Sequence, residues 1–423
     1  AEYLYLAGRN WADERFSPAI AEALIATGNV EYLCLAGRDW PDGRFSAEIG
    51  RALVEAGVPK YLYLAGKAWS DARYTTAIAE RLVEQKDPKY LYLAGKYWPS
   101  SRRSRAFGVA LAETDAPRYL YLAGKGWSKL PYSPAIAQAL VECGDAKYLY
   151  GAGLDWPDGR FSPAIAEALV KTGNAEYLYL AGRDWPDGRF DSRIAQALVK
   201  ACNAKCLYLA GLFWRDDRFD KTMAQALAKT KDAESIYLAG LSWRDDRFDT
   251  AMAYALAETQ DAKYIYLAGK DWSNKRLDKV ISQALAKTKN AKYIYLAGLN
   301  WPESLFYEDI VQALLETDDP EHLYLAGRDW SDERYSDEIR GALIQIGDAE
   351  TLYRAGLNWP DGRYTDDILD ALLGTHNLKY IYLAGRDWPA KRTNDALAEA
   401  LRESGDAYWM AQAKASWRTL ELS

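Results

Sequence analysis

The residue types that most often perform chemistry are scarce in this chain, and those that recur do so in many copies. The 423 residues include two histidines and four cysteines, with no Cys-x-x-Cys pair. This leaves little material for a zinc site or for histidine-based catalysis. An Asp is repeatedly followed two residues later by Arg, as in Asp42 and Arg44. Because catalysis needs one special site, many copies of one pair indicate structural pairing within or between neighbouring turns.

The sequence also argues against several function classes. No nucleophile–base constellation, phosphate-binding loop or unique carboxylate pair stands out, so we expect no enzyme and no cofactor. The net charge of −7 argues against general nucleic-acid binding. No apolar run approaches the 18 residues of a membrane-spanning helix, so no transmembrane segment is expected.

A tryptophan recurs every 29 residues, from Trp11 to Trp388. The spacing divides the chain into fourteen units over residues 1–406 and a remainder over 407–423. Equal units that each pack only on their neighbours are typical of a solenoid. Trp417 keeps the spacing in the remainder, but the preceding Leu-x-Leu has become Met-Ala-Gln. The remainder is therefore interpreted as a degenerate fifteenth repeat that acts as a C-terminal cap.

Each unit predicts a strand, a turn and a short helix. In residues 175–203, Tyr-Leu-Tyr-Leu alternates with the period of a strand and Ala-Gly then indicates a turn. Ser, Thr or Asp follows, often before Pro, as at Ser17 and Pro18, which predicts a helix N-cap. Gly28 or Gly57 predicts the helix end. Stacked units would form an α/β solenoid, a curved horseshoe with a continuous parallel sheet on its concave side and helices on its convex side.

One family has a similar pattern. Residues 30–40, Val-Glu-Tyr-Leu-Cys-Leu-Ala-Gly-Arg-Asp-Trp, resemble the leucine-rich-repeat pattern LxxLxLxxNxL. Phe45, Ile49 and Leu53 stand where ribonuclease-inhibitor-like repeats place the apolar residues of their helical half. The resemblance covers all fourteen units. It implies a horseshoe that binds other macromolecules through its concave sheet.

The second tyrosine of the Tyr-Leu-Tyr-Leu segment is present in 13 of the 14 units, and Cys34 is the exception. On a strand, these side chains would cover the concave sheet. Two interpretations are compatible: an aromatic ladder that stabilises the sheet, and a contact surface for a partner. The candidate binding residues are Tyr5, Tyr63, Tyr92, Tyr121, Tyr150, Tyr179, Tyr208, Tyr237, Tyr266 and Tyr295, and the same position holds Tyr324, Tyr353 and Tyr382.

Repeats 3–5 concentrate basic residues and lose an acidic one. Ala68, Tyr97 and Gly126 stand where most units carry Asp or Asn. Stacked like charges repel one another, so this basic stripe is either a solvated face or a docking site for an acidic protein segment, a lipid head group or a polyanion. The candidate residues are Lys60, Lys67, Lys89, Lys96, Arg102, Arg103, Arg105, Arg118 and Lys125.

Three functions fit these observations. The first is a non-enzymatic scaffold that binds a protein partner through the tyrosine surface and the basic stripe. The second is a structural subunit that assembles end to end into a filament, because the first predicted strand has an unpaired edge. The third is a glycan-binding protein that uses tyrosine platforms.

Overall fold

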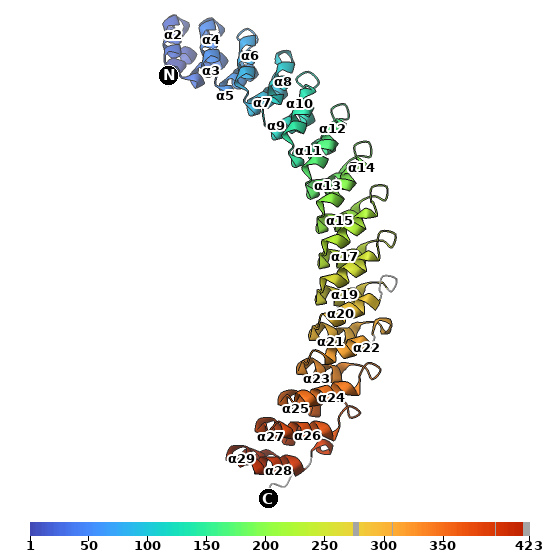
Figure 1. Cartoon of the computed structure of the whole chain (residues 1–423). Helices are drawn as coiled ribbons and strands as arrows, with labels where there is room; N and C mark the ends of the chain where they lie inside the picture. The colour runs from blue at the N-terminus through green and yellow to red at the C-terminus, as the bar shows by residue number, and fades with distance from the viewer. Residues whose placement is uncertain (274–278, 307, 394, 418–423) are drawn as a thin grey trace. The chain divides into compact units, whose positions relative to one another are not determined.

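The computed structural model describes residues 1–273, 279–306, 308–393 and 395–417. Within these residues the chain forms 29 α-helices and no β-strand (Figure 1). The expected parallel sheet, the α/β class and the horseshoe are therefore wrong. The resemblance to leucine-rich repeats is wrong for the same reason, since that family requires strands. The chain is a helical repeat protein.

Each complete repeat supplies two helices, here called the first and the second helix. The first helices are α1 (Glu2–Asn10), α3 (Val30–Asp39), α5 (Pro59–Ala68), α7 (Pro88–Tyr97), α9 (Pro117–Gly126), α11 (Ala146–Asp155), α13 (Ala175–Asp184), α15 (Ala204–Phe213), α17 (Ala233–Ser242), α19 (Ala262–Asp271), α21 (Ala291–Asn300), α23 (Pro320–Asp329), α25 (Ala349–Asn358), α27 (Leu378–Asp387) and α29 (Ala407–Ser416).

The second helices follow the polar turn of each repeat. They are α2 (Pro18–Ala26), α4 (Ala47–Ala56), α6 (Thr76–Gln85), α8 (Arg105–Ala112), α10 (Ala135–Cys143), α12 (Pro163–Thr172), α14 (Ser192–Ala201), α16 (Thr222–Thr230), α18 (Ala251–Thr259), α20 (Lys279–Lys287), α22 (Glu308–Leu315), α24 (Asp337–Ile346), α26 (Asp366–Gly374) and α28 (Asp395–Ser404). Short 3-10 turns precede some of them: η1 (Asp13–Arg15), η2 (Asp42–Arg44), η3 (Ser100–Arg102), η4 (Glu303–Leu305) and η5 (Ala390–Arg392).

The Tyr-Leu-Tyr-Leu segment is helical because its apolar residues also fit a helical period. In repeat 7, Leu178, Ala181, Gly182 and Trp185 are spaced at i, i+3, i+4 and i+7, and all four are buried. Residues with this spacing lie on one face of a helix. A four-residue alternation is too short to exclude this pattern. The Ala-Gly pair that suggested a turn is therefore part of a helix.

The predicted caps of the second helices are confirmed in part, because Ser46 and Thr75 precede their helices without accepting a cap hydrogen bond. The Ser17 side chain accepts a hydrogen bond from the Ala19 amide, and Gly57 adopts the left-handed conformation that ends α4. In several repeats an Asn or Asp follows the glycine at the helix end, as Asn29 follows Gly28, and it has a different role. Asn29 and Asn174, for example, accept hydrogen bonds from backbone amides at the start of the next first helix. These residues thus specify the helix that the sequence analysis missed.

The helices group into two compact units, which we describe separately. One comprises residues 1–201 and 213–219, and the other comprises residues 202–212 and 220–423. Within each unit, the first helices from α1 to α13 and from α17 to α29 contact their neighbours in the row, and those that have a second helix in their own repeat contact it, as α5 contacts α7 and α6. Side chains on the first helices can therefore form rows across neighbouring repeats.

Candidate functional site

Any binding surface must be built from residues that the contacts between repeats leave available, and the tryptophans that recur every 29 residues after Trp11 are not among them. Each indole of the 29-residue series from Trp40 to Trp417 packs on a glycine of the preceding repeat, as Trp185 packs on Gly153. A Cβ on these glycines would lie only 2.0 to 2.5 Å from the ring. Each indole N–H also donates to a backbone carbonyl of the preceding repeat, as Trp185 donates to Tyr150 at 3.0 Å. The recurring Gly and Trp thus form one interlocking contact, which explains why both recur in every repeat.

An arginine in the polar turn forms a second contact between repeats. The Arg363 guanidinium donates to the carbonyls of Gly327 at 2.9 Å and Trp330 at 2.7 Å, and to Asp332 at 2.6 Å. The same arrangement joins Arg73 to Asp42. The Asp and Arg pairs seen in the sequence therefore connect neighbouring repeats. They hold the C-terminal end of the preceding first helix, where a cation is favourable.

The tyrosine hydroxyls form a third contact between repeats. Tyr150 donates to Asp184 of the next repeat at 2.6 Å, and Arg183 holds the same carboxylate at 2.7 Å. Arg183 and, to a smaller degree, the Tyr150 hydroxyl keep the pKa of Asp184 below its ordinary value. The carboxylate thus forms an ion pair with a base beside it on its own helix and accepts a hydrogen bond from a hydroxyl of the helix before it.

This contact makes the array sensitive to alkali. Burial, followed by the hydrogen bond to a neighbouring Asp, raises the pKa of Tyr237, Tyr295 and Tyr353 to about 12. An unfolded tyrosine releases its proton near pH 10, so between about pH 10 and 12 the folded chain holds more protons than the unfolded chain. Stability should therefore fall with rising pH across this window. Urea unfolding followed by circular dichroism should show a midpoint that falls between about pH 10 and 12. A midpoint that stays constant across this window would contradict this.

The candidate tyrosines lie on first helices rather than on a sheet, and they pack between repeats. Tyr5, Tyr63, Tyr92, Tyr179, Tyr266 and Tyr295 are buried, and Tyr121, Tyr150, Tyr208 and Tyr237 are partly exposed. Eight of the ten rings contact the aromatic side chain at the start of the next first helix, as Tyr63 contacts Tyr90 at a centroid distance of 5.9 Å, whereas Tyr179 and Tyr208 have Cys206 and Ser235 at that position. They therefore present little ring surface to a ligand.

The basic candidates divide into two groups. Arg102 is buried and forms the arginine contact to Gly66, Trp69 and Asp71 of the preceding repeat. Arg103 donates to the Trp98 carbonyl at 2.7 Å. The arginine that would come from the next repeat to this carbonyl is replaced by Pro131, so Arg103 supplies the missing donor. Arg102 and Arg103 thus have structural partners, and Arg105 is exposed at the start of α8.

The other six bases share one face of three consecutive first helices. Each helix carries two bases seven residues apart, which is two helical turns and places them on the same side. All six are exposed. We call this set the basic face: Lys60 and Lys67 on α5, Lys89 and Lys96 on α7, and Arg118 and Lys125 on α9. The helices lie side by side in Figure 1, and α7 contacts both α5 and α9.

The basic face lacks the carboxylates that accompany bases elsewhere. In repeats 2, 7, 12 and 14 the base near the end of the first helix pairs with the Asp that follows it. Lys67 and Lys96 are followed instead by Ala68 and Tyr97. Their ammonium groups lie 5.6 and 5.3 Å from the centre of the half-exposed Tyr97 ring. A hydrogen bond with the Tyr92 hydroxyl raises the pKa of Lys96, which keeps it charged. Lys125 differs, because it pairs with Asp155 at 2.9 Å.

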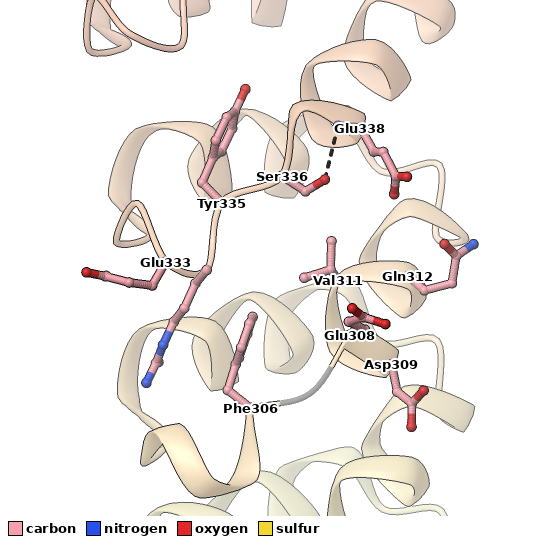
Figure 2. Close-up of a pocket in the computed structure, with 10 residues that line it drawn as sticks. Phe306, Glu308, Asp309, Val311, Gln312, Glu333, Tyr335, Ser336 and Glu338 are labelled. Carbon is pink, nitrogen blue, oxygen red and sulfur yellow. Dashed lines mark hydrogen bonds between the residues drawn. The ribbon is translucent and has the colours of Figure 1, made fainter.

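A hollow of about 690 Å³ lies between the second helices α22 and α24 (Figure 2). Phe306, Val311 and Tyr335 contribute its apolar lining, and Glu308 and Glu338 are among the acids around it. Burial raises the pKa of Tyr335, so its hydroxyl stays neutral. Across the described ranges, no three His, Cys, Asp or Glu side chains are grouped so that they could hold a metal ion.

Comparison with known proteins adds no assignment. No protein-family model matches the chain, and no curated protein matches it. In the part of the chain that the structure describes, no helix combines the length and the apolar character needed to cross a bilayer. The surface chemistry must therefore carry the functional argument. Cys34 and Ala68 are named in the sequence analysis as two separate exceptions to the repeat pattern, and the structure brings them together at one junction between repeats.

Proposed function

We propose that this protein is a non-enzymatic helical repeat scaffold whose basic face binds an acidic segment of a protein partner. One observation supports the proposal most strongly. In repeats such as 2 and 7 the base forms an ion pair with the Asp that follows it, whereas Lys67 and Lys96 are followed by Ala68 and Tyr97, which have no carboxylate. An exposed row of unneutralised cations gains most from a partner that brings carboxylates. The exposed Tyr97 ring adds an aromatic contact of the kind enriched at interfaces.

Reversing two of these charges tests the proposal. Lys67→Glu combined with Lys96→Glu should weaken binding of an acidic peptide by at least about tenfold, because attraction becomes repulsion. The stability of the fold should change little, since both side chains are exposed. Isothermal titration calorimetry with a Glu-rich peptide at two salt concentrations gives the affinity, and wild-type binding should weaken as salt is added.

A matched control makes the same change of charge on the opposite side of the repeats. Lys171→Glu and Lys200→Glu alter two exposed lysines of second helices and should leave the affinity for the peptide close to that of wild type. If both double variants lose the same affinity for the peptide, the effect comes from the net charge of the protein and not from the basic face. Tight binding of anionic lipid vesicles or of a single-stranded nucleic acid, without binding of acidic peptides, would contradict the proposal.

End-to-end assembly by continued stacking of repeats is disfavoured by one residue. A following tryptophan needs a glycine in the first helix on which it packs, and every repeat from the first to the fourteenth has one. The fifteenth has Lys414 at that position, on α29. A lysine side chain there would occupy the volume that an incoming indole needs. The degenerate fifteenth repeat is thus suited to end the stack.

A further inference from the structure

One junction on the side of the first helices departs from the pattern twice. Each of the other junctions has a tyrosine on one first helix, and at most of them its hydroxyl hydrogen-bonds the residue 34 positions later on the next first helix, as Tyr5 donates to Asp39 at 2.5 Å. Between α3 and α5 the tyrosine is Cys34 and the aspartate is Ala68. No other junction has lost both partners. The volume of an aromatic ring and of a carboxylate is therefore missing from one place.

A pocket occupies this place. It has a volume of about 100 Å³ and lies between α3 and α5. Cys34, Leu35, Leu64 and Ala68 give it an apolar lining. Burial raises the pKa of the Cys34 thiol to about 12, so the thiol is a neutral, apolar part of this lining. The volume corresponds to roughly three water molecules, which is enough for one branched aliphatic side chain.

The charges around the pocket are unequal on its two sides. On the N-terminal side of the pocket, the first helices carry an acid at their start, namely Glu2 on α1 and Glu31 on α3. On the other side the same position holds Lys60 on α5, Lys89 on α7 and Arg118 on α9. The bases at the helix starts therefore begin at the pocket and continue in one direction, whereas Arg38 of α3, which also lines the pocket, is paired with Asp39 at 2.7 Å.

We propose that this pocket receives an aliphatic anchor side chain from the acidic segment, whose carboxylates then follow the basic face across α5, α7 and α9. The inference rests on the proposed function and names the chemistry of its partner. Packed helices are about 8–10 Å apart. An extended polyproline-II segment has three residues per turn and rises about 3.1 Å per residue, so every third side chain points the same way at intervals that match the helices. The partner sequence is therefore Leu-x-x-Glu-x-x-Glu, in one of the two chain directions.

Filling the pocket with the residues that the other repeats use tests this inference. Cys34→Tyr combined with Ala68→Asn recreates the neutral pair of Tyr266 and Asn300, which fills the pocket without adding a carboxylate beside Lys67. A capped Leu-x-x-Glu-x-x-Glu peptide, synthesised in both chain directions, is titrated by calorimetry into the wild type and into this variant. We expect the filled variant to bind the better peptide at least about tenfold more weakly, because it excludes the anchor side chain. Its thermal unfolding midpoint should not be lower than that of wild type.

A second peptide separates the pocket from the basic face. Replacing Leu by Ala should weaken binding to the wild type and leave binding to the filled variant almost unchanged. If the two peptides bind the wild type equally, or if filling the pocket leaves the affinity unchanged, the pocket inference is wrong even though charge reversal at Lys67 and Lys96 abolishes binding. If the wild type binds none of the acidic peptides, the proposed function itself fails.

Discussion

Replacing Trp185 with alanine should lower the free energy of unfolding by about 3–5 kcal/mol, as truncation of a large buried side chain usually does. Trp185 is 2% exposed, packs on Gly153 and against the edge of Phe161, and donates its indole N–H to the Tyr150 carbonyl. The variant loses packing on both sides and leaves that carbonyl with one hydrogen bond fewer. Urea unfolding followed by circular dichroism gives the change in stability.

The damage should also be local, because each repeat contacts only its neighbours. Hydrogen exchange should therefore accelerate most in α11 and α13, and little in α1 or α5. A loss of stability below about 1 kcal/mol would show that the indole contributes no buried contact. Uniformly faster exchange along the chain would contradict the nearest-neighbour picture.

Replacing glycine with alanine should change the stability in opposite directions at two helical glycines of one repeat. Gly327 lies in α23, and a Cβ there would be 2.1 Å from the Trp359 ring. Gly341 lies in α24, and a Cβ there would meet no atom within 4 Å. Alanine is favoured over glycine inside a helix by about 1 kcal/mol, whereas overpacking usually costs about 1–3 kcal/mol and sometimes more.

We therefore expect Gly327→Ala to destabilise the protein by at least about 2 kcal/mol and Gly341→Ala to stabilise it by up to about 1 kcal/mol. The two variants have the same chemical change, the same repeat and the same type of element, so each serves as the control for the other. Chemical denaturation measures both. A stabilising Gly327→Ala would mean that no indole lies against this glycine.

The sequence predicts the parts of the fold that depend on single-residue signals. The spacing of the tryptophans gives the repeat, and Ser17 and Gly57 mark the start and end of second helices. The first helices are missed because the Leu-x-Leu alternation and the helical spacing of Leu178, Ala181, Gly182 and Trp185 share the same residues. One signal could have distinguished them. A glycine in a turn has no reason to occur three residues before the tryptophan in repeat after repeat. A helical glycine on which the next tryptophan packs does have such a reason.

The basic face is only partly predictable for a related reason. Lys67 and Lys96 stand out because their neighbours break the repeat pattern, which the sequence displays. Arg102 and Arg103 also appear in the sequence as extra basic residues of repeat 4. Their carbonyl partners, however, depend on how the repeats stack. The pocket at Cys34 and Ala68 depends on the same stacking, because these residues lie 34 positions apart in the sequence. Only the helical register brings them together.

The contact of each indole with a glycine of the preceding repeat is the claim on which this account depends, and a double-mutant cycle at Gly327 and Trp359 measures it most directly. Trp359→Leu removes the ring that a Cβ at residue 327 would meet. In that background we expect Gly327→Ala to lose its penalty and to approach the gain of up to about 1 kcal/mol that a helix gives to alanine, so the two changes should be strongly non-additive. Additive effects, with Gly327→Ala equally destabilising with and without the indole, would contradict it.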